Sequence, residues 1–233
     1  PFEAVKTNVI GAHNIVKAAI ENNVKNVIAI STDKAVKPVN AMGITKALQE
    51  KIILSNEITK NDTIFCCVRY GNVLGSRGSV IPLWDKKLAQ KKPLPITHSN
   101  MTRFMLTLSE AIDLVFYALK NSKGGEIFVK KAPATKMINL ARAYAELKTG
   151  KKNYPLSFIG IRAGEKIDEI LVSEEEMRHS TEKKDHFVIH REPEIDIKSV
   201  KKETKFIEYG SGTATHLGID ELKSIMKNLK WTI

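Results

Sequence analysis

Apolar residues in the first third of the chain alternate between a helical spacing and short continuous runs. Residues 3–22 carry apolar side chains at helical intervals, and the β-branched run Val27–Ile30 follows them. A second helix is predicted at about 41–59, ahead of another apolar run at 63–69. Short uncharged runs that alternate with helices are typical of parallel strands buried on both faces. The pattern therefore predicts an α/β fold built on the second half of a doubly wound parallel sheet.

The later segments predict a mixture of helices and short strands. Further helices are expected at 79–90, 110–121, 137–148 and 220–229, and extended segments at 92–97, 126–130 and 156–161. Ser109 is expected to cap the second of these helices, and Gly150 is expected to end the third. Residues 181–205 are polar with mixed charge, which predicts a loop-rich segment.

The strand expected at 27–31 ends in three polar residues, Thr32, Asp33 and Lys34. In open α/β sheets ligands bind just beyond the carboxyl ends of the strands. A hydroxyl, a carboxylic acid and an amine at that position, with Lys46 on the next predicted helix, form a plausible acid–base set. The alternative is an ordinary polar loop between a strand and a helix.

Composition excludes several classes of protein. The net charge of +11 is spread along the chain without interleaved aromatic residues, so we expect a lysine-rich surface and no nucleic-acid partner. No apolar run approaches the roughly 20 residues that span a bilayer, and no leader peptide is apparent. Adjacent Cys66 and Cys67 would point to opposite faces of a strand, as buried thiols in a reducing cytoplasm. The six histidines show no metal-ligand spacing.

Four long motifs together resemble the extended short-chain dehydrogenase/reductase family. They are STDKAVKPVNAMGITK, RYGNVLGSRGSVIPLW, MTRFMLTLSEAIDLV and IRAGEKIDEIL. The most similar branch is the capsule-type, C5-inverting UDP-N-acetylglucosamine 4,6-dehydratases of polysaccharide biosynthesis. The resemblance implies a Rossmann-type domain at 1–78 that lacks its first half, a smaller α/β sugar-nucleotide domain at 79–180, and a polar tail with a final helix at 181–233.

The resemblance also implies roles for individual residues in a reaction that uses NAD or NADP. Asp33 would be the acid that assists loss of the C6 hydroxyl, Lys34 the base at C5, and Thr32 a hydrogen-bond partner of the C4 oxygen. Lys46 would hold the nicotinamide ribose, and Tyr70 would lie near the nicotinamide. For Lys34 to act as a base, the fold would have to lower its pKa.

The implied substrate is a UDP-N-acetylhexosamine, and its contacts come from the later motifs. Asn72 would contact the sugar, whereas Arg103, Arg162 and Glu165 would hold the uridine diphosphate, with Arg77 as a further candidate. The planar guanidinium suits phosphate because it offers paired donors. The full-length protein is expected to be a homo-oligomer.

Two departures from the family pattern keep other interpretations open. Met42 stands where most members have the proton-accepting tyrosine of Tyr-x-x-x-Lys, and methionine cannot accept a proton. Thr32, relayed to Lys46 or water, is the candidate for that step. No glycine-rich turn of the dinucleotide-binding type is present. A nucleotide-sugar 4-epimerase and a non-catalytic sugar-nucleotide binding fragment therefore remain alternatives.

Overall fold

A computed structural model describes residues 1–55, 62–76, 79–191 and 206–228 of the 233-residue chain. The chain divides into two compact units that interleave along the sequence. The first unit comprises Pro1–Tyr70, Ser109–Lys131 and Ile170–Gly210, and the second comprises Gly71–Leu108, Ala132–Glu169 and Ser211–Ile233. These units differ from the three consecutive segments expected from the sequence because later strands return to the first sheet.

The first unit is built on a five-stranded mixed sheet. Its helices and turns are α1 (Phe2–Ala4), the π-helix η1 (Val5–Ile10), α2 (Gly11–Glu21), the 3₁₀ turn η2 (Asp33–Ala35), α3 (Ala41–Ile53), α5 (Leu108–Asn121) and α7 (Glu174–Met177). Its strands are β1 (Asn26–Thr32), β2 (Ile64–Tyr70), β5 (Ile127–Lys130), β8 (Ile170–Val172), β9 (Ser180–Glu182), β10 (His186–Ile189) and β11 (Tyr209–Gly210). The strand order is β1-β2-β5-β10-β9, and β8 pairs with β11 separately.

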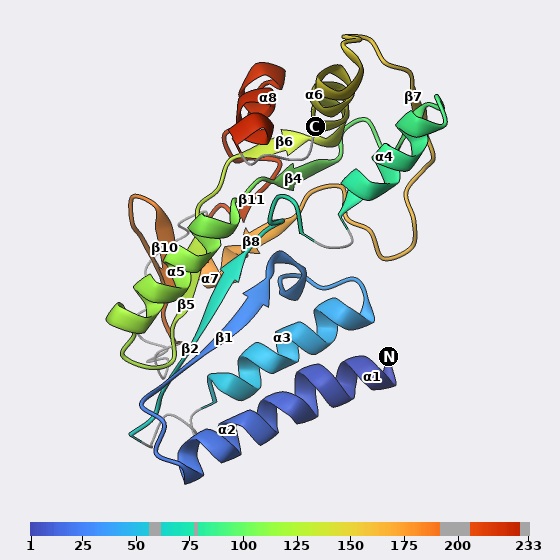
Figure 1. Cartoon of the computed structure of the whole chain (residues 1–233). Helices are drawn as coiled ribbons and strands as arrows, with labels where there is room; N and C mark the ends of the chain where they lie inside the picture. Colours follow the sequence, from blue (N-terminus) through green and yellow to red (C-terminus); the bar gives the residue numbers. More distant parts are fainter. Residues whose placement is uncertain (56–61, 77–78, 192–205, 229–233) are drawn as a thin grey trace. The chain divides into compact units, whose positions relative to one another are not determined.

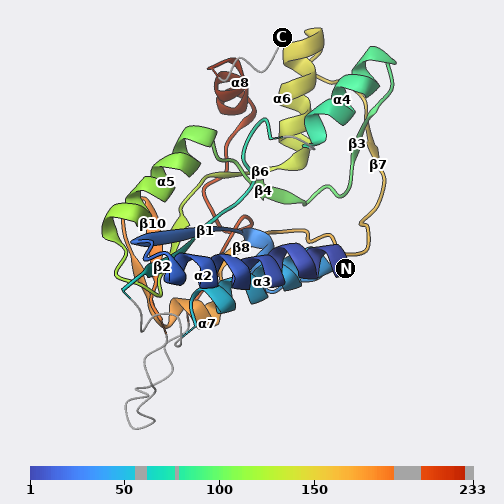
Figure 2. The same cartoon turned by 60° about the horizontal axis from the view of Figure 1, so that its bottom comes forward.

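The parallel core predicted from the apolar runs is confirmed. Strand β1 pairs with β2 in parallel over its whole length, and β2 pairs in parallel with β5. Strands β10 and β9 then extend the sheet in antiparallel fashion. Helices α2 and α3 lie side by side in both Figure 1 and Figure 2, and α3 packs against β1 and β2.

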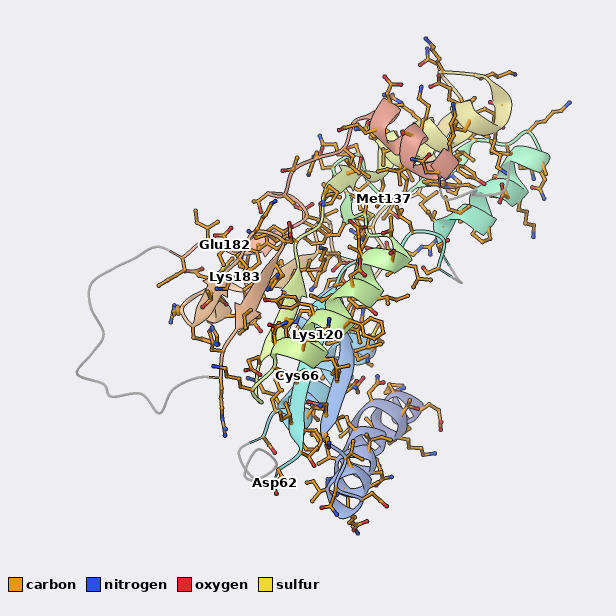
Figure 3. All side chains as sticks on the ribbon, turned by 60° about the vertical axis from the view of Figure 1, so that its left-hand side comes forward. Asp62, Cys66, Lys120, Met137, Glu182 and Lys183 are labelled. Atoms are coloured by element: carbon orange, nitrogen blue, oxygen red, sulfur yellow. The ribbon has the colours of Figure 1, made fainter. Side chains whose placement is uncertain are left out.

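Helix α5 covers the opposite face of this sheet. Its residues Leu114 and Ala118 form a buried cluster with Cys66 and Val68 of β2 and Phe128 of β5. Figure 3 shows Cys66 on β2 and Lys120 on the covering helix. Both cysteines are free and buried, as expected, because neighbouring residues of a strand face opposite sides.

Two local predictions are wrong. Part of the segment predicted to be loop-rich, His186–Ile189, is the strand β10, with all four residues buried between β5 and β9. Its run of three apolar residues, Phe187–Ile189, is too short to stand out in a charged segment. Residues 192–205 of that segment lie outside the described chain. Ser109 is not the N-cap of α5, because that helix already begins at Leu108.

The described residues of the second unit form short strand pairs that pack with helices. The elements are α4 (Val80–Ala89), β3 (Leu94–Ile96), β4 (Thr102–Phe104), β6 (Ala134–Lys136), α6 (Met137–Thr149), β7 (Leu156–Phe158) and α8 (Ile219–Asn228). Strand β3 pairs with β7, and β4 pairs with β6. Fully buried Trp84 lies in a core with Leu140, Tyr144 and Leu222. Helix α6 ends as predicted, because Gly150 adopts the left-handed conformation with φ 72°.

Helices long and apolar enough to cross a bilayer are absent from the described residues.

Candidate active site at the strand ends and a cavity in the second unit

The predicted polar residues gather at the carboxyl ends of β1 and β2. Thr32 is the last residue of β1, and its partner across the parallel ladder is Tyr70, the last residue of β2. Asp33 and Lys34 follow in the 3₁₀ turn η2. The strand register therefore brings together four of the predicted site residues, at the position where open α/β sheets bind ligands.

Asp33 is the centre of this group. Its side chain is fully buried, and its Oδ1 atom accepts hydrogen bonds from Thr32 Oγ1 at 2.7 Å and Lys34 Nζ at 2.9 Å. Its other oxygen, Oδ2, has no partner among the described residues. Buried polar atoms are normally hydrogen-bonded, so an acceptor left over in a fully buried carboxyl group indicates a place for a ligand.

A close approach of α3 fixes the turn that carries Asp33 and Lys34. Asn40 caps α3 by accepting a hydrogen bond from Gly43 N at 2.9 Å. A Cβ atom at Gly43 would lie 2.4 Å from the carbonyl oxygen of Lys34, closer than side chains can approach. Glycine at position 43 therefore allows the helix to lie directly against the turn.

Lys46 lies on the next turn of α3, and its amine reaches back to the same strand. Its Nζ donates to the carbonyl oxygen of Ile30 and to Gln49 Oε1, each at 2.9 Å. Burial lowers the pKa of Lys46, although Cys67 and Glu50 act in the opposite direction. The relay from Thr32 to Lys46 suggested by the sequence is not formed here, because the Thr32 hydroxyl donates to Asp33 instead.

The residues that flank this group have simpler surroundings. Burial raises the pKa of Tyr70, which keeps its phenol protonated. Met42 is 43% exposed on α3, so it is not a core residue. Ser31, next to Thr32, is buried with a hydroxyl that has no partner among the described residues. Sequence reasoning missed Ser31, and its position between the apolar run and Thr32 is the signal that could have found it.

The second unit contains a cavity of about 330 Å³ that three other predicted residues line. Asn72, Arg103 and Glu165 contribute to its wall. The rest of the wall is mainly apolar, with Met101, Met105, Met137 and Leu140 among its residues. Asn72 Oδ1 is buried without a partner among the described residues, so this lining residue has an acceptor that a ligand could use.

The guanidinium of Arg103 is largely occupied by the protein itself. Its Nη1 donates to the carbonyl oxygens of Thr102 at 2.6 Å and Ile167 at 3.0 Å, and Nη2 donates to that of Lys166 at 3.0 Å. Glu169 lies 3.7 Å from its Nε. Arg103 therefore ties β4 to the segment before β8, which the sequence motif did not indicate.

The remaining predicted contacts fall in three different places. Glu165 accepts a hydrogen bond from the backbone nitrogen of Arg162 at 3.1 Å, so it stabilises a turn at the cavity wall. The Arg162 residue itself is exposed and does not line the cavity. Arg77 lies outside the described residues. Among those that are described, no group of three metal-ligating side chains occurs.

Comparison with known proteins identifies the chain's relatives. Residues 1–191 match the model of a family described as "Polysaccharide biosynthesis protein". The chain is 42% identical to a protein of Rickettsia felis named UDP-glucose 4-epimerase, over 99% of this chain and 70% of that protein. A Rickettsia massiliae protein of the same name is 41% identical over the same shares.

Solved structures agree on the fold. The structure of Pen from Bacillus thuringiensis matches with a TM-score of 0.84 and 37% identity, over 98% of this chain and 70% of that one. UDP-glucuronic acid 4-epimerase from Bacillus cereus, in complex with UDP-glucuronic acid and NAD, matches with a TM-score of 0.62 and 20% identity. That match covers 70% of this chain and 57% of the other, and it supports the α/β fold.

Proposed function

This chain belongs to the polysaccharide biosynthesis protein family of extended short-chain dehydrogenases/reductases, and from that premise we propose that its reaction begins by oxidising C4 of a UDP-linked sugar. It is a nucleotide-sugar-modifying enzyme of this superfamily. The observation that carries the proposal is the cluster of Thr32, Asp33 and Lys34 at the carboxyl ends of β1 and β2, with Lys46 one helix away.

The names of the relatives favour 4-epimerisation as the net reaction over the dehydration expected from the sequence. Relatives 40–42% identical are named UDP-glucose 4-epimerase. In an epimerase the C4 ketone is reduced again from the other face, so the mass of the sugar nucleotide does not change. We therefore put 4-epimerisation of a UDP-hexose first and keep dehydration as the second candidate.

NAD is the proposed cofactor, since structural relatives contain it. The residues at the strand ends fit such a group: Lys46 offers a partly buried amine, and the Ser31 hydroxyl and Asp33 Oδ2 have unused hydrogen-bonding capacity among the described residues. When bound, NAD would supply the hydride acceptor and donor that C4 chemistry requires. Lys46 would hold the hydroxyls of its nicotinamide ribose.

The chain's own residues would then manage the protons. The hydroxyl of Thr32, which donates to Asp33 Oδ1, would bind the C4 oxygen, and Asp33 would take the proton that leaves it. This route would take the place of proton transfer to the family's tyrosine, because the chain has Met42 at that position. Burial of Asp33 excludes water from the transfer, and the lowered pKa of Lys46 increases the fraction of neutral amine that could share it.

One observation favours dehydration as the second candidate. Lys34 Nζ lies 2.9 Å from Asp33, so an acid and a potential base stand side by side, as removal of the C5 proton and loss of the C6 hydroxyl would require. Lys34 is one-third exposed and donates to Asp33 here. To serve as a base it would have to give up that proton and the hydrogen bond.

The uridine diphosphate is proposed to bind in the cavity of the second unit. Asn72 Oδ1 is the available acceptor, and the methionine-rich wall suits the flat face of a base. Arg103 could contact a phosphate only by exchanging some of its bonds to backbone carbonyls. Arg162 and Arg77 remain proposed contacts on the strength of the sequence motif.

The products of the full-length enzyme distinguish the candidates. The enzyme would be incubated with NAD and either UDP-glucose or UDP-N-acetylglucosamine in heavy water and analysed by mass spectrometry and NMR. A C4 epimer with no deuterium at C5 supports epimerisation. Loss of water with deuterium at C5 supports dehydration. Unchanged substrates and no reduced cofactor at any time would contradict both.

A further inference from the structure

A fully buried arginine connects three elements of the first unit. Arg69 on β2 is 1% exposed, and its guanidinium lies between two carboxylates. Its Nε donates to Glu50 Oε1 at 3.0 Å and its Nη2 to Glu50 Oε2 at 2.6 Å, which makes a paired contact with α3. Its Nη1 and Nη2 each donate to Glu176 of α7 at 2.9 Å. Arg69 therefore joins β2 to both α3 and α7.

The position of this cluster relates it to the strand ends. Arg69 directly precedes Tyr70, and its partner across the ladder is Ser31, which precedes Thr32. Glu50 follows Lys46 by four residues, so the two side chains lie on the same face of α3. The contact between Arg69 and Glu50 therefore fixes the helix that carries Lys46 against the strands that carry Thr32 and Tyr70.

We propose that Arg69, acting through Glu50, is a positioning residue that holds the Lys46 amine at the carboxyl end of β1. A catalytic role for Lys46 rests on the proposed function. The positioning of its amine by Arg69 and Glu50 does not depend on that function. Gly43 sets how closely the first turn of α3 approaches the Asp33 turn, and the paired contact of Arg69 sets the next two turns.

A purely structural role is the alternative to be excluded. Removing one partner of a buried ion pair is strongly destabilising wherever the pair lies, so a loss of stability alone would not support the proposal. The charged and titratable groups that face Lys46 are Glu50 of its own helix and Cys67 of β2. Glu176 binds the same guanidinium but stands on α7 and is not among them.

The two carboxylates therefore provide a matched pair of variants. Glu50→Gln and Glu176→Gln each neutralise one partner of Arg69 and leave the other in place. In both, the remaining carboxylate keeps the guanidinium paired, and circular dichroism would check the fold. The reactivity of the Lys46 amine would be measured in each by competitive acetylation between pH 7 and 11, with mass spectrometry of the Lys46 peptide. Exposed Lys17, which has a glutamate at the same spacing, is the internal reference.

Both variants should lose thermal stability, but only Glu50→Gln should change Lys46. Loss of the neighbouring negative charge and of the fixed helix position should increase acetylation of Lys46 at pH 8 by about three- to tenfold relative to Lys17. In the full-length enzyme with NAD and sugar nucleotide, Glu50→Gln and the charge-conserving Glu50→Asp should slow cofactor reduction at nearly unchanged KM. Glu176→Gln should not.

Equal Lys46 reactivity in the two glutamine variants would overturn the inference and make the cluster a structural ion pair. The same conclusion follows if the Glu50→Asp enzyme reduces the cofactor at the wild-type rate. A difference in acetylation without any cofactor reduction in the wild type would support the positioning role and contradict the proposed function.

Discussion

The strand-end group and the cavity of the second unit use their charged side chains in opposite ways. Asp33 is fully buried, yet one of its oxygens has no partner among the described residues. Arg103 is the stronger phosphate binder by residue type, yet it donates to three backbone carbonyls. Two sequence motifs that both predict ligand contacts therefore place their charged residues in different surroundings. Unused hydrogen-bonding capacity, rather than the presence of charge, distinguishes a side chain poised for a ligand from one that holds the fold.

The largest effect should come from the strand-end group itself. In the full-length enzyme, Asp33→Asn should reduce turnover about 100- to 10,000-fold, because it removes the group proposed to exchange protons with the sugar. Its near-identical shape should preserve the fold. Steady-state product formation and absorbance of reduced cofactor would be measured together, with Lys17→Ala as a control on an exposed lysine.

The same measurements separate the candidates. Under dehydration, Asp33→Asn and Lys34→Ala still oxidise C4 and accumulate reduced cofactor, whereas Lys46→Ala does not. If Asp33 takes the C4 proton, as we propose for epimerisation, Asp33→Asn also loses cofactor reduction. Turnover of Asp33→Asn within twofold of the wild type would exclude Asp33 from either role.

Arg103→Ala tests the other side of the comparison. Because the guanidinium satisfies carbonyl oxygens of Thr102, Lys166 and Ile167, its loss should lower the free energy of unfolding by about 2–4 kcal/mol. Urea unfolding measures this, and KM reports any phosphate contact in addition. Exposed Arg162→Ala should change stability by less than about 0.5 kcal/mol. A raised KM at unchanged stability would mean that Arg103 serves the ligand alone.

Two glycines of the first unit provide a smaller and more local test. Gly43→Ala places a Cβ 2.4 Å from the Lys34 carbonyl oxygen, so it should cost about 1–3 kcal/mol and displace the Asp33 turn. Gly11→Ala, on α2, meets the nearest atom at an ordinary 3.5 Å. It should stabilise the protein by about 0.5–1 kcal/mol, as alanine does in helix interiors. Thermal unfolding and turnover of both variants check this. Equal stabilities would show that α3 can move away from the turn at little cost.

The smallest expected effect is a pH dependence of stability that arises at His186. His186 is buried on β10 against Tyr117, with ring centroids 4.3 Å apart. Burial, with a contribution from Lys130, lowers its pKa, so the folded protein binds this proton less readily than the unfolded chain. Stability should be constant above about pH 6.5 and fall as the pH drops below it. His186→Phe should reduce this fall in urea unfolding measured at pH 8 and 5.5. If the wild type and His186→Phe lost the same stability between pH 8 and 5.5, the fall would come from other titrating groups.

The sequence predicted the elements that local spacing determines. The strands β1 and β2, the start of α3 near Ala41 and the left-handed end of α6 at Gly150 all follow from periodicity and cap residues. The predicted strand β1 also located the strand-end group, because polar residues that follow a buried parallel strand lie at the carboxyl end of the sheet. The sequence motifs correctly assigned the superfamily, whereas the relatives' names favour a different reaction from the one expected.

The tertiary structure decided what each charged residue does. Arg69 finds its carboxylates 19 and 107 positions away, and the short apolar run of β10 becomes a strand because β5 and β9 lie on either side of it. The occupation of Arg103 by carbonyl oxygens has the same origin, since Lys166 and Ile167 are more than 60 positions away. The spacing of apolar residues shows which side of a helix or strand is buried, because that side is formed by residues close together in the sequence. Pairing of a buried charge depends on which distant segment packs against it, and no local pattern contains that information.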